Sequence, residues 1–118
     1  MARVEITQSV GPEVITSIDE SALPQNTTNK YSTMVDVSRY TLHSYHVISD
    51  KICQFTIAGS NVTAPATIAD WVTISTHVVA AGTPLAYSDT WNFKYSRVLI
   101  TTAAVGNAAV KVHEKHNA

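Results

Sequence analysis

The chain has 118 residues, of which 45% are hydrophobic and only 14% are charged, so it suits one domain with its own core and excludes a largely disordered chain. Eight Lys and Arg residues stand against nine Asp and Glu residues, and this net charge of -1 offers no basic field for nucleic acid or an anionic membrane. No apolar run approaches the roughly 18 residues of a membrane span, and the first ten residues lack the apolar stretch of a signal peptide. We therefore expect synthesis in the cytoplasm and neither a nucleic-acid nor a membrane partner.

β-branched residues dominate the composition. The chain has 15 Thr, 14 Val and 9 Ile residues but only 4 Leu. Because β-branched side chains fit a pleated, half-buried surface and lose rotamer freedom on a helix, this balance predicts a strand-rich protein. The single cysteine, Cys53, is expected to be a small, semi-buried apolar residue, with a thiol pair between subunits as the alternative.

The beginning of the chain is expected to form an arm. Arg3–Thr7 alternates like a short strand, and residues 24–29 are a cluster of turn and loop formers. Such an arm either lies along its own sandwich or adds strands to a neighbouring subunit, and the sequence leaves both alternatives open. We therefore divide the chain into an N-terminal arm, 1–30, and a β-sandwich domain, 31–118.

Beyond the arm, apolar residues recur with a period of two, as they do on a strand with one buried face. The expected strands are 32–37, 40–48, 52–57, 71–75, 76–79, 89–95, 97–101 and 108–113. Turn signals at Ser49–Lys51 and at Gly106-Asn107 predict hairpins between the strands that flank them. Short strands at this spacing, with no apolar stripe of helical period, predict an all-β fold: an antiparallel β-sandwich or jelly roll with an extended N-terminal arm.

Histidines and acids are the candidates for chemistry. His43 and His46 lie three apart, and on a strand an odd spacing points side chains to opposite faces, which disfavours a shared metal ion. His113 and His116 have the same spacing in what we expect to be a frayed C-terminal tail. Four acids beside turns or strand ends are expected to make local hydrogen bonds: Asp36, Asp50, Asp70 and Asp89. The sequence shows no nucleophile elbow, phosphate-binding loop or paired cysteines, so we expect no enzyme, metal or cofactor.

Aromatic residues gather in the second half of the chain. Trp91, Phe93 and Tyr95 alternate with polar residues, the pattern of one buried strand face, and we expect them to make core or subunit contacts. A second interpretation joins them with Trp71 and Tyr87 in a platform on which sugars stack.

Five segments form a recognisable series: 36–40, 55–61, 71–74, 94–101 and 106–112. The series includes a strand that ends in a Gly-Ser-Asn turn, a Trp strand, a Tyr-x-Arg-Val strand and a closing Gly-x-Ala-x-Val hairpin. It resembles the small β-sandwich domains of tailed-bacteriophage structural proteins, in which these motifs recur in this order. The resemblance covers about Tyr31 to Glu114, and the glycine-rich, Trp-containing loop that often follows the Gly-Ser-Asn turn is replaced by Val62–Pro65.

The resemblance implies a non-enzymatic virion protein, most similar to the decoration or cement proteins that stabilise a capsid shell by bridging major capsid protein subunits. We then expect a location on the capsid surface and self-association as a dimer or trimer. The residues of the arm expected to bind the partner are Val4, Ile6, Val14 and Ile15.

A second hypothesis comes from a different class of function. The chain would be a carbohydrate-binding adhesion module, or a tail, baseplate or fibre component, that recognises the host surface. It predicts saturable glycan binding that is lost when an exposed Trp71 or Tyr87 is replaced.

Overall fold

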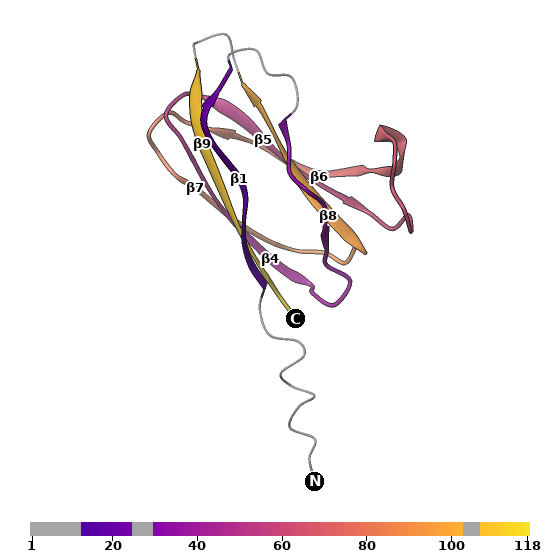
Figure 1. Ribbon diagram of the computed structural model, residues 1–118. Coiled ribbons are helices and arrows are strands. Elements are labelled where there is room, and N and C mark those ends of the chain that lie inside the picture. The colour runs from indigo at the N-terminus through magenta and orange to yellow at the C-terminus, as the bar shows by residue number, and fades with distance from the viewer. Residues whose placement is uncertain (1–12, 25–29, 103–106) are drawn as a thin grey trace.

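Two antiparallel sheets face each other in the computed structural model, which describes residues 13–24, 30–102 and 107–118 (Figure 1). The first sheet has the strand order β1-β9-β4-β7. The second sheet has the order β2-β8-β5-β6, and β3 also pairs with β8. The elements are β1 (Glu13–Leu23), β2 (Lys30–Tyr31), β3 (Val35–Asp36), β4 (Leu42–Ser49), β5 (Cys53–Ser60), the short 3-10 helix η1 (Ile68–Asp70), β6 (Val72–Val79), β7 (Leu85–Thr90), β8 (Tyr95–Thr102) and β9 (Ala108–Asn117). Apart from the steps from β2 to β3 and from β5 to β6, each step along the chain leads from one sheet to the other, in the manner of a jelly roll. The predicted all-β sandwich is confirmed.

The core lies between the sheets and is built from alternate residues of each strand. β8 and β9 show this alternation along their whole length, with every second side chain buried. β5 departs from it, because the outward-facing Thr56 and Ala58 are also covered, at 9% and 4% exposed. The fully enclosed core side chains include Phe55, Ile57, Val98, Ile100 and Val112.

The two predicted hairpins are wrong. β4 pairs with β7 and β9, whereas β5 pairs with β6 and β8, so the turn between β4 and β5 carries the chain from one sheet to the other. β8 and β9 also belong to different sheets. Turn residues specify where a strand ends, but not whether the next strand pairs with it or crosses the core.

Part of the expected arm is a strand of the sandwich. β1 pairs with β9 along its length, and its residues Ile18 and Leu23 are buried in the core, at 3% and 4% exposed. For Glu13–Leu23 the structure therefore decides between the two alternatives: this segment lies along its own sandwich. Register shifts between Thr16 and Ile18 and again before Leu23 break the period of two, which is why the alternation is not visible in the sequence.

The strand expected at 89–95 is interrupted, because β7 ends at Thr90 and β8 begins at Tyr95. The residues between them cross from the first sheet to the second. The ring of Trp91 stacks on His43 with centroids 3.5 Å apart and meets Phe93 edge to face at 5.8 Å, whereas Tyr95 faces outward on β8. The three aromatic side chains thus do not share one strand face, and Trp91 packs against the core.

Gly59 leaves the space that Phe93 fills. A Cβ atom at Gly59 would lie 2.6 Å from Cγ and Cδ2 of the Phe93 ring and 3.1 Å from Ile74 Cδ1. We predict that Gly59→Ala lowers the free energy of unfolding by about 1–3 kcal/mol, because the ring must leave its position. Urea denaturation measures the loss, and Gly59→Ala combined with Phe93→Leu should lose less than the sum of the two single variants. Additive losses would contradict the close approach.

Candidate functional site

The outer edges of the two sheets differ in how well they are protected against pairing with another chain. β2 and β3 span two residues each, β7 spans six, and β1 is interrupted by two register shifts. Short strands, bulges and charged side chains are the devices by which proteins block edge-to-edge pairing. β6 is eight residues long and has one register shift in its pairing with β5, where β1 has two. Its sequence VTISTHVV contains no Asp, Glu, Lys, Arg or Pro. Among the described strands, this edge, which we call the β6 edge, is the most open to a partner strand.

Exposed apolar side chains stand at both ends of the β6 edge. Val72 exposes 56% and Val78 exposes 62% of its surface. Val78 and the half-exposed Ile52 line an apolar hollow of about 320 Å³. A strand added to β6 would cover these side chains, and so would gain apolar burial in addition to main-chain hydrogen bonds.

The four residues expected to anchor the arm fall into two groups. Val4 and Ile6 lie outside the described residues. Val14, at the beginning of β1, is 69% exposed, and Ile15 is half-buried beside the exposed Met34 at a hollow of about 590 Å³. In the described part of the arm, Val14 is the one large apolar side chain that is exposed to solvent.

The joint sugar platform of five aromatic residues does not form. Tyr87 lies on β7 in the first sheet, where its hydroxyl donates a hydrogen bond to Asp89 (2.9 Å). Trp71 lies beside the second sheet, and its ring faces the guanidinium of Arg97. Tyr31, which the sequence analysis missed, faces the same guanidinium. No local signal could identify Tyr31, because the pairing of β2 with β8 joins distant parts of the chain.

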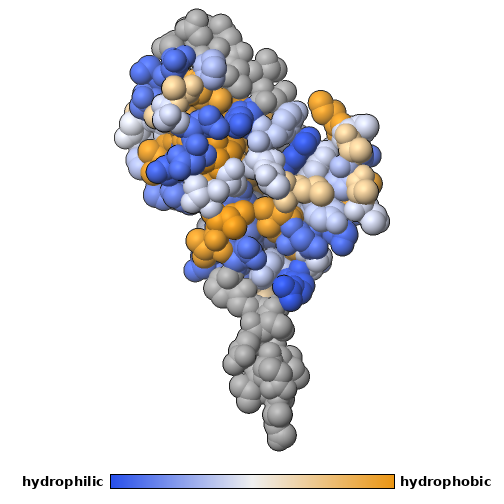
Figure 2. All heavy atoms as spheres, viewed as in Figure 1, coloured by the Kyte–Doolittle hydropathy of each residue, from blue (hydrophilic) through white to orange (hydrophobic). Residues whose placement is uncertain are grey.

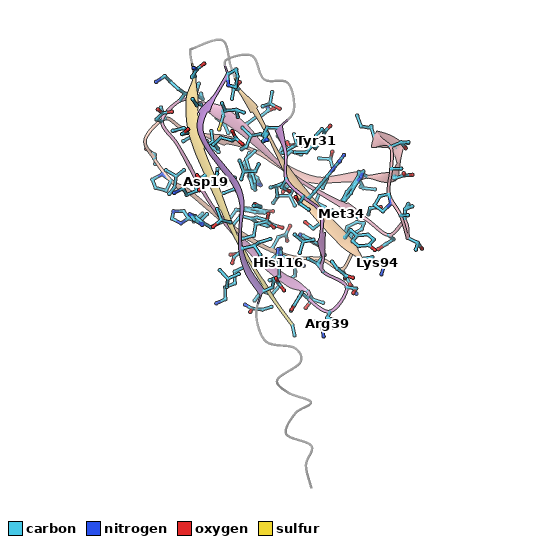
Figure 3. The ribbon with its side chains drawn as sticks, in the orientation of Figure 1. Asp19, Tyr31, Met34, Arg39, Lys94 and His116 are labelled. Carbon is cyan, nitrogen blue, oxygen red and sulfur yellow. The ribbon has the colours of Figure 1, made fainter. Side chains whose placement is uncertain are left out.

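A chain of buried polar groups lies between the sheets, where β4 begins and β9 ends. His43 and His116 are 0% exposed and Glu114 is 2% exposed. The Nδ1 atoms of the two histidines lie 2.8 Å apart, and Nε2 of His116 lies 2.9 Å from Oε1 of Glu114. Figure 3 shows His116 in this interior position. The expectation of a frayed tail at 113–116 is therefore wrong, since these residues belong to β9.

The hydrogen-bond partners of His43 determine which of its ring nitrogens donates and which accepts. Nε2 of His43 lies 3.1 Å from the carbonyl oxygen of Trp91, which can only accept, so His43 donates from Nε2. In neutral His43, Nδ1 then accepts a hydrogen bond from Nδ1–H of His116. Neutral His43 thus has a hydrogen-bond partner at each of its ring nitrogens. Nε2 of His116 faces Oε1 of Glu114 at the other end of the network.

The pKa of His43 is lowered from its usual value of 6.5. The largest cause is burial, which disfavours the imidazolium, and the charge of His116 acts in the same direction. The Trp91 carbonyl, Asp89 and Glu114 oppose the shift but do not reverse it. His46 points to the other face of β4 and is exposed, so the predicted separation of His43 and His46 is confirmed.

The prediction of local hydrogen bonds is confirmed for Asp36, Asp70 and Asp89. It is wrong for Asp50, which accepts its bond from Ala109 on the distant strand β9. Each carboxylate accepts a backbone N–H at a turn or strand end. The bonds run from Ser38 to Asp36, from Ala109 to Asp50, from Ala66 and Thr67 to Asp70, and from Thr90 to Asp89.

Residues 13–24, 30–102 and 107–118 contain no group of three or more His, Cys, Asp or Glu side chains placed to hold a metal ion. In the same ranges, no helix has the length and apolar character to cross a bilayer. Cys53 is 4% exposed, and burial raises the pKa of its thiol.

Comparisons with known proteins identify shared folds. No protein-family model matches the chain, and neither does any curated protein. The PBSX exported protein XepA superimposes with a TM-score of 0.73 at 15% identity over 90% of this chain and 37% of its own, so this chain spans little more than a third of the length of XepA. A protein of Bacillus endospore appendages, described as disulfide-linked pili, gives a TM-score of 0.61 at 14% identity, with 92% of this chain and 87% of that chain covered. At these identities the likeness shows the fold alone.

The lowered pKa of His43 predicts how stability depends on pH. Below about pH 6.5 the unfolded chain takes up a proton on His43 that the folded protein does not bind. The free energy of unfolding should therefore fall as the pH decreases from 7.5 toward 5, at a slope of at most about 1.4 kcal/mol per pH unit from this group, and should recover above pH 6.5. Urea denaturation over this pH range measures the slope.

His43→Phe should flatten this slope whatever its effect on absolute stability, because the titrating group is gone. His46→Gln is the matched control, since it removes an exposed histidine of the same strand and should keep the slope of the wild type. An unchanged slope in His43→Phe would contradict the assignment.

Proposed function

We propose that the protein is a non-enzymatic structural component of a tailed-phage virion, which decorates the capsid surface and stabilises the shell by bridging major capsid protein subunits. The observation that carries this proposal is the β6 edge, an uncharged eight-residue edge strand with Val72 and Val78 exposed, on a jelly roll whose other edges are short, bulged or charged. An exposed edge of this kind recognises a partner strand through main-chain hydrogen bonds and requires no catalytic pocket.

Mass action explains how such binding would stabilise a shell. A small protein that binds the assembled lattice but not the separated subunits shifts the equilibrium toward the lattice by an amount that grows with its concentration. The contact surface needs no strong charge for this purpose, and the chain carries a net charge of only -1.

The arm is proposed to supply a second contact with the shell. We assign Val4 and Ile6 to this contact, with Val14 continuing it at the start of β1, where its side chain is 69% exposed. Because β1 carries core residues, a deletion that tests the arm has to end before Glu13.

Self-association as a dimer or trimer is part of the same proposal. Of the three aromatic residues assigned to core or subunit contacts, Trp91 packs against the core and Phe93 lies over Gly59. Tyr95 faces outward, with Nζ of Lys94 5.0 Å from its ring centroid, and is the one placed to contact a second copy.

The resemblance to phage sandwich domains supports the placement in a virion. Its segments 55–61, 71–74 and 94–101 fall on or next to β5, β6 and β8, the neighbouring long strands of the second sheet. The resemblance therefore includes the strand that forms the β6 edge.

Lysines on the β6 edge test the proposal. We predict that Val72→Lys combined with Val78→Lys weakens cosedimentation with purified capsid shells by about tenfold or more, because charged side chains block pairing at an edge. The fold should be retained, since both side chains point to solvent, and circular dichroism checks this. Val62→Lys is the matched control, because Val62 is an exposed valine in the loop after β5.

A chain without residues 1–12 tests the arm separately and keeps the whole of β1. The proposal expects it to remain folded and to bind shells more weakly. Full shell binding by both the double lysine variant and the shortened chain would overturn the bridging role.

A further inference from the structure

A polar hollow on the outer face of the second sheet forms a separate candidate binding site. It has a volume of about 350 Å³ and spans β2, β8, β5 and β6, with the η1 segment at its side. This volume lies at the lower end of the roughly 300–1,000 Å³ of small-molecule pockets. Figure 1 shows η1 projecting beyond the sheet, and the matching projection in Figure 2 ends in apolar atoms. The hollow is thus walled on one side by a segment that stands clear of the sandwich.

Arg97 is the one charged residue that lines the hollow. Its Cζ atom lies 4.1 Å from the ring centroid of Tyr31 and 4.4 Å from that of Trp71. The two rings come from opposite sides of β8, because β2 flanks it on one side and β5 and β6 lie on the other. Tyr31 is visible in Figure 3 on β2. The cation–π contacts hold the guanidinium in place and leave its N–H edge for hydrogen bonds.

The charge of Arg97 is not matched by an acid in the described part of the chain. The ion pairs there join Lys30 to Glu20, Lys94 to Asp36 and His116 to Glu114. Nε of Arg97 is also buried without a hydrogen-bond partner in the described structure. Because Nε is enclosed, the terminal NH2 groups of the held guanidinium are the donors for a ligand in the hollow, and the pair of them suits a carboxylate, which can accept two parallel hydrogen bonds.

The rest of the lining points to a ligand with many hydroxyl groups. Gln54, Thr73 and Thr76 place an amide and two hydroxyls at the hollow, and each can both donate and accept. A phosphate-rich ligand or a nucleic acid would call for several cations, whereas this hollow provides one. We propose that the hollow binds a carboxylate-bearing sugar residue, a hexuronate or a sialic acid, with Arg97 on the carboxylate and the polar side chains on the sugar hydroxyls. This proposal does not rest on the role in the shell.

Calorimetric titration with acidic and neutral sugars tests the site. The probes are a galacturonate oligosaccharide and sialyllactose, compared with the galacturonate methyl ester and with lactose. We expect one of the two acids to bind and its neutral counterpart to bind about tenfold more weakly or not at all, because the ester and lactose lack the charged acceptor. The acid that binds identifies the source of the carboxylate.

Arg97→Gln should lower the affinity for that acid by about tenfold or more. Lys111→Gln is the matched control, because it removes one positive charge from an exposed position on the other sheet and should bind as the wild type does. Thr73→Val provides a second, near-isosteric variant that keeps all charges, and it should also weaken binding. Melting curves by circular dichroism check that each variant is folded.

Four results would overturn the proposal. The first is no heat of binding with either acid at millimolar concentration. The second is equal affinity for an acid and its neutral counterpart. The third is unchanged affinity in both Arg97→Gln and Thr73→Val. The fourth is tighter binding of an N-acetylated peptide with a free C-terminal carboxylate than of either sugar acid, which would assign the hollow to a peptide terminus.

Discussion

The double pairing of β9 is the constraint on which the rest of the structure depends. β9 lies between β1 and β4 and pairs with both along most of its length. Its inward face contributes Val110 and Val112 to the apolar core and then continues with Glu114 and His116, which are equally buried. Burying these polar groups is costly unless they find hydrogen-bond partners, and His43 on the neighbouring strand provides one. The ring of Trp91 then stacks on His43, which places the crossing between β7 and β8 over this end of the sandwich.

The sequence predicts the local alternation well and the tertiary pairing poorly. The sequence predicts a strand over 108–113, whereas β9 continues to Asn117. The inward-facing His116 finds a partner in His43 on β4, and Glu114 finds one in His116 on β9 itself. At both places where the sequence predicts a hairpin, the chain passes from one sheet to the other. The residues of a turn do not specify which strand the next strand will pair with. The sequence does not predict β1 as a strand of the sandwich, because its two bulges shift side chains from one face to the other and so break the period of two.

The candidate sites illustrate the same limit. The sequence predicts β6 as two adjacent strands, but its position at an edge follows from the order of the whole sheet. The sequence identifies Trp71 as a candidate binding residue, but it does not show that Arg97 is its neighbour in space. Tyr31 joins these two residues because β2 pairs with β8. The second sheet therefore carries two separate surfaces, the edge of β6 and the hollow on its outer face. A strand added in the plane of the sheet would leave the hollow on that face open.

The number of copies in purified phage particles tests whether this jelly roll belongs to a capsid lattice. Quantitative mass spectrometry can compare peptides of this chain with peptides of the major capsid protein in the same particles. Bridging at repeated lattice positions requires several hundred copies in a simple ratio to the shell subunit, and this is the expected result. A few copies per particle would assign the chain to the tail or fibres and contradict the bridging role, and absence from the particles would contradict a virion role altogether.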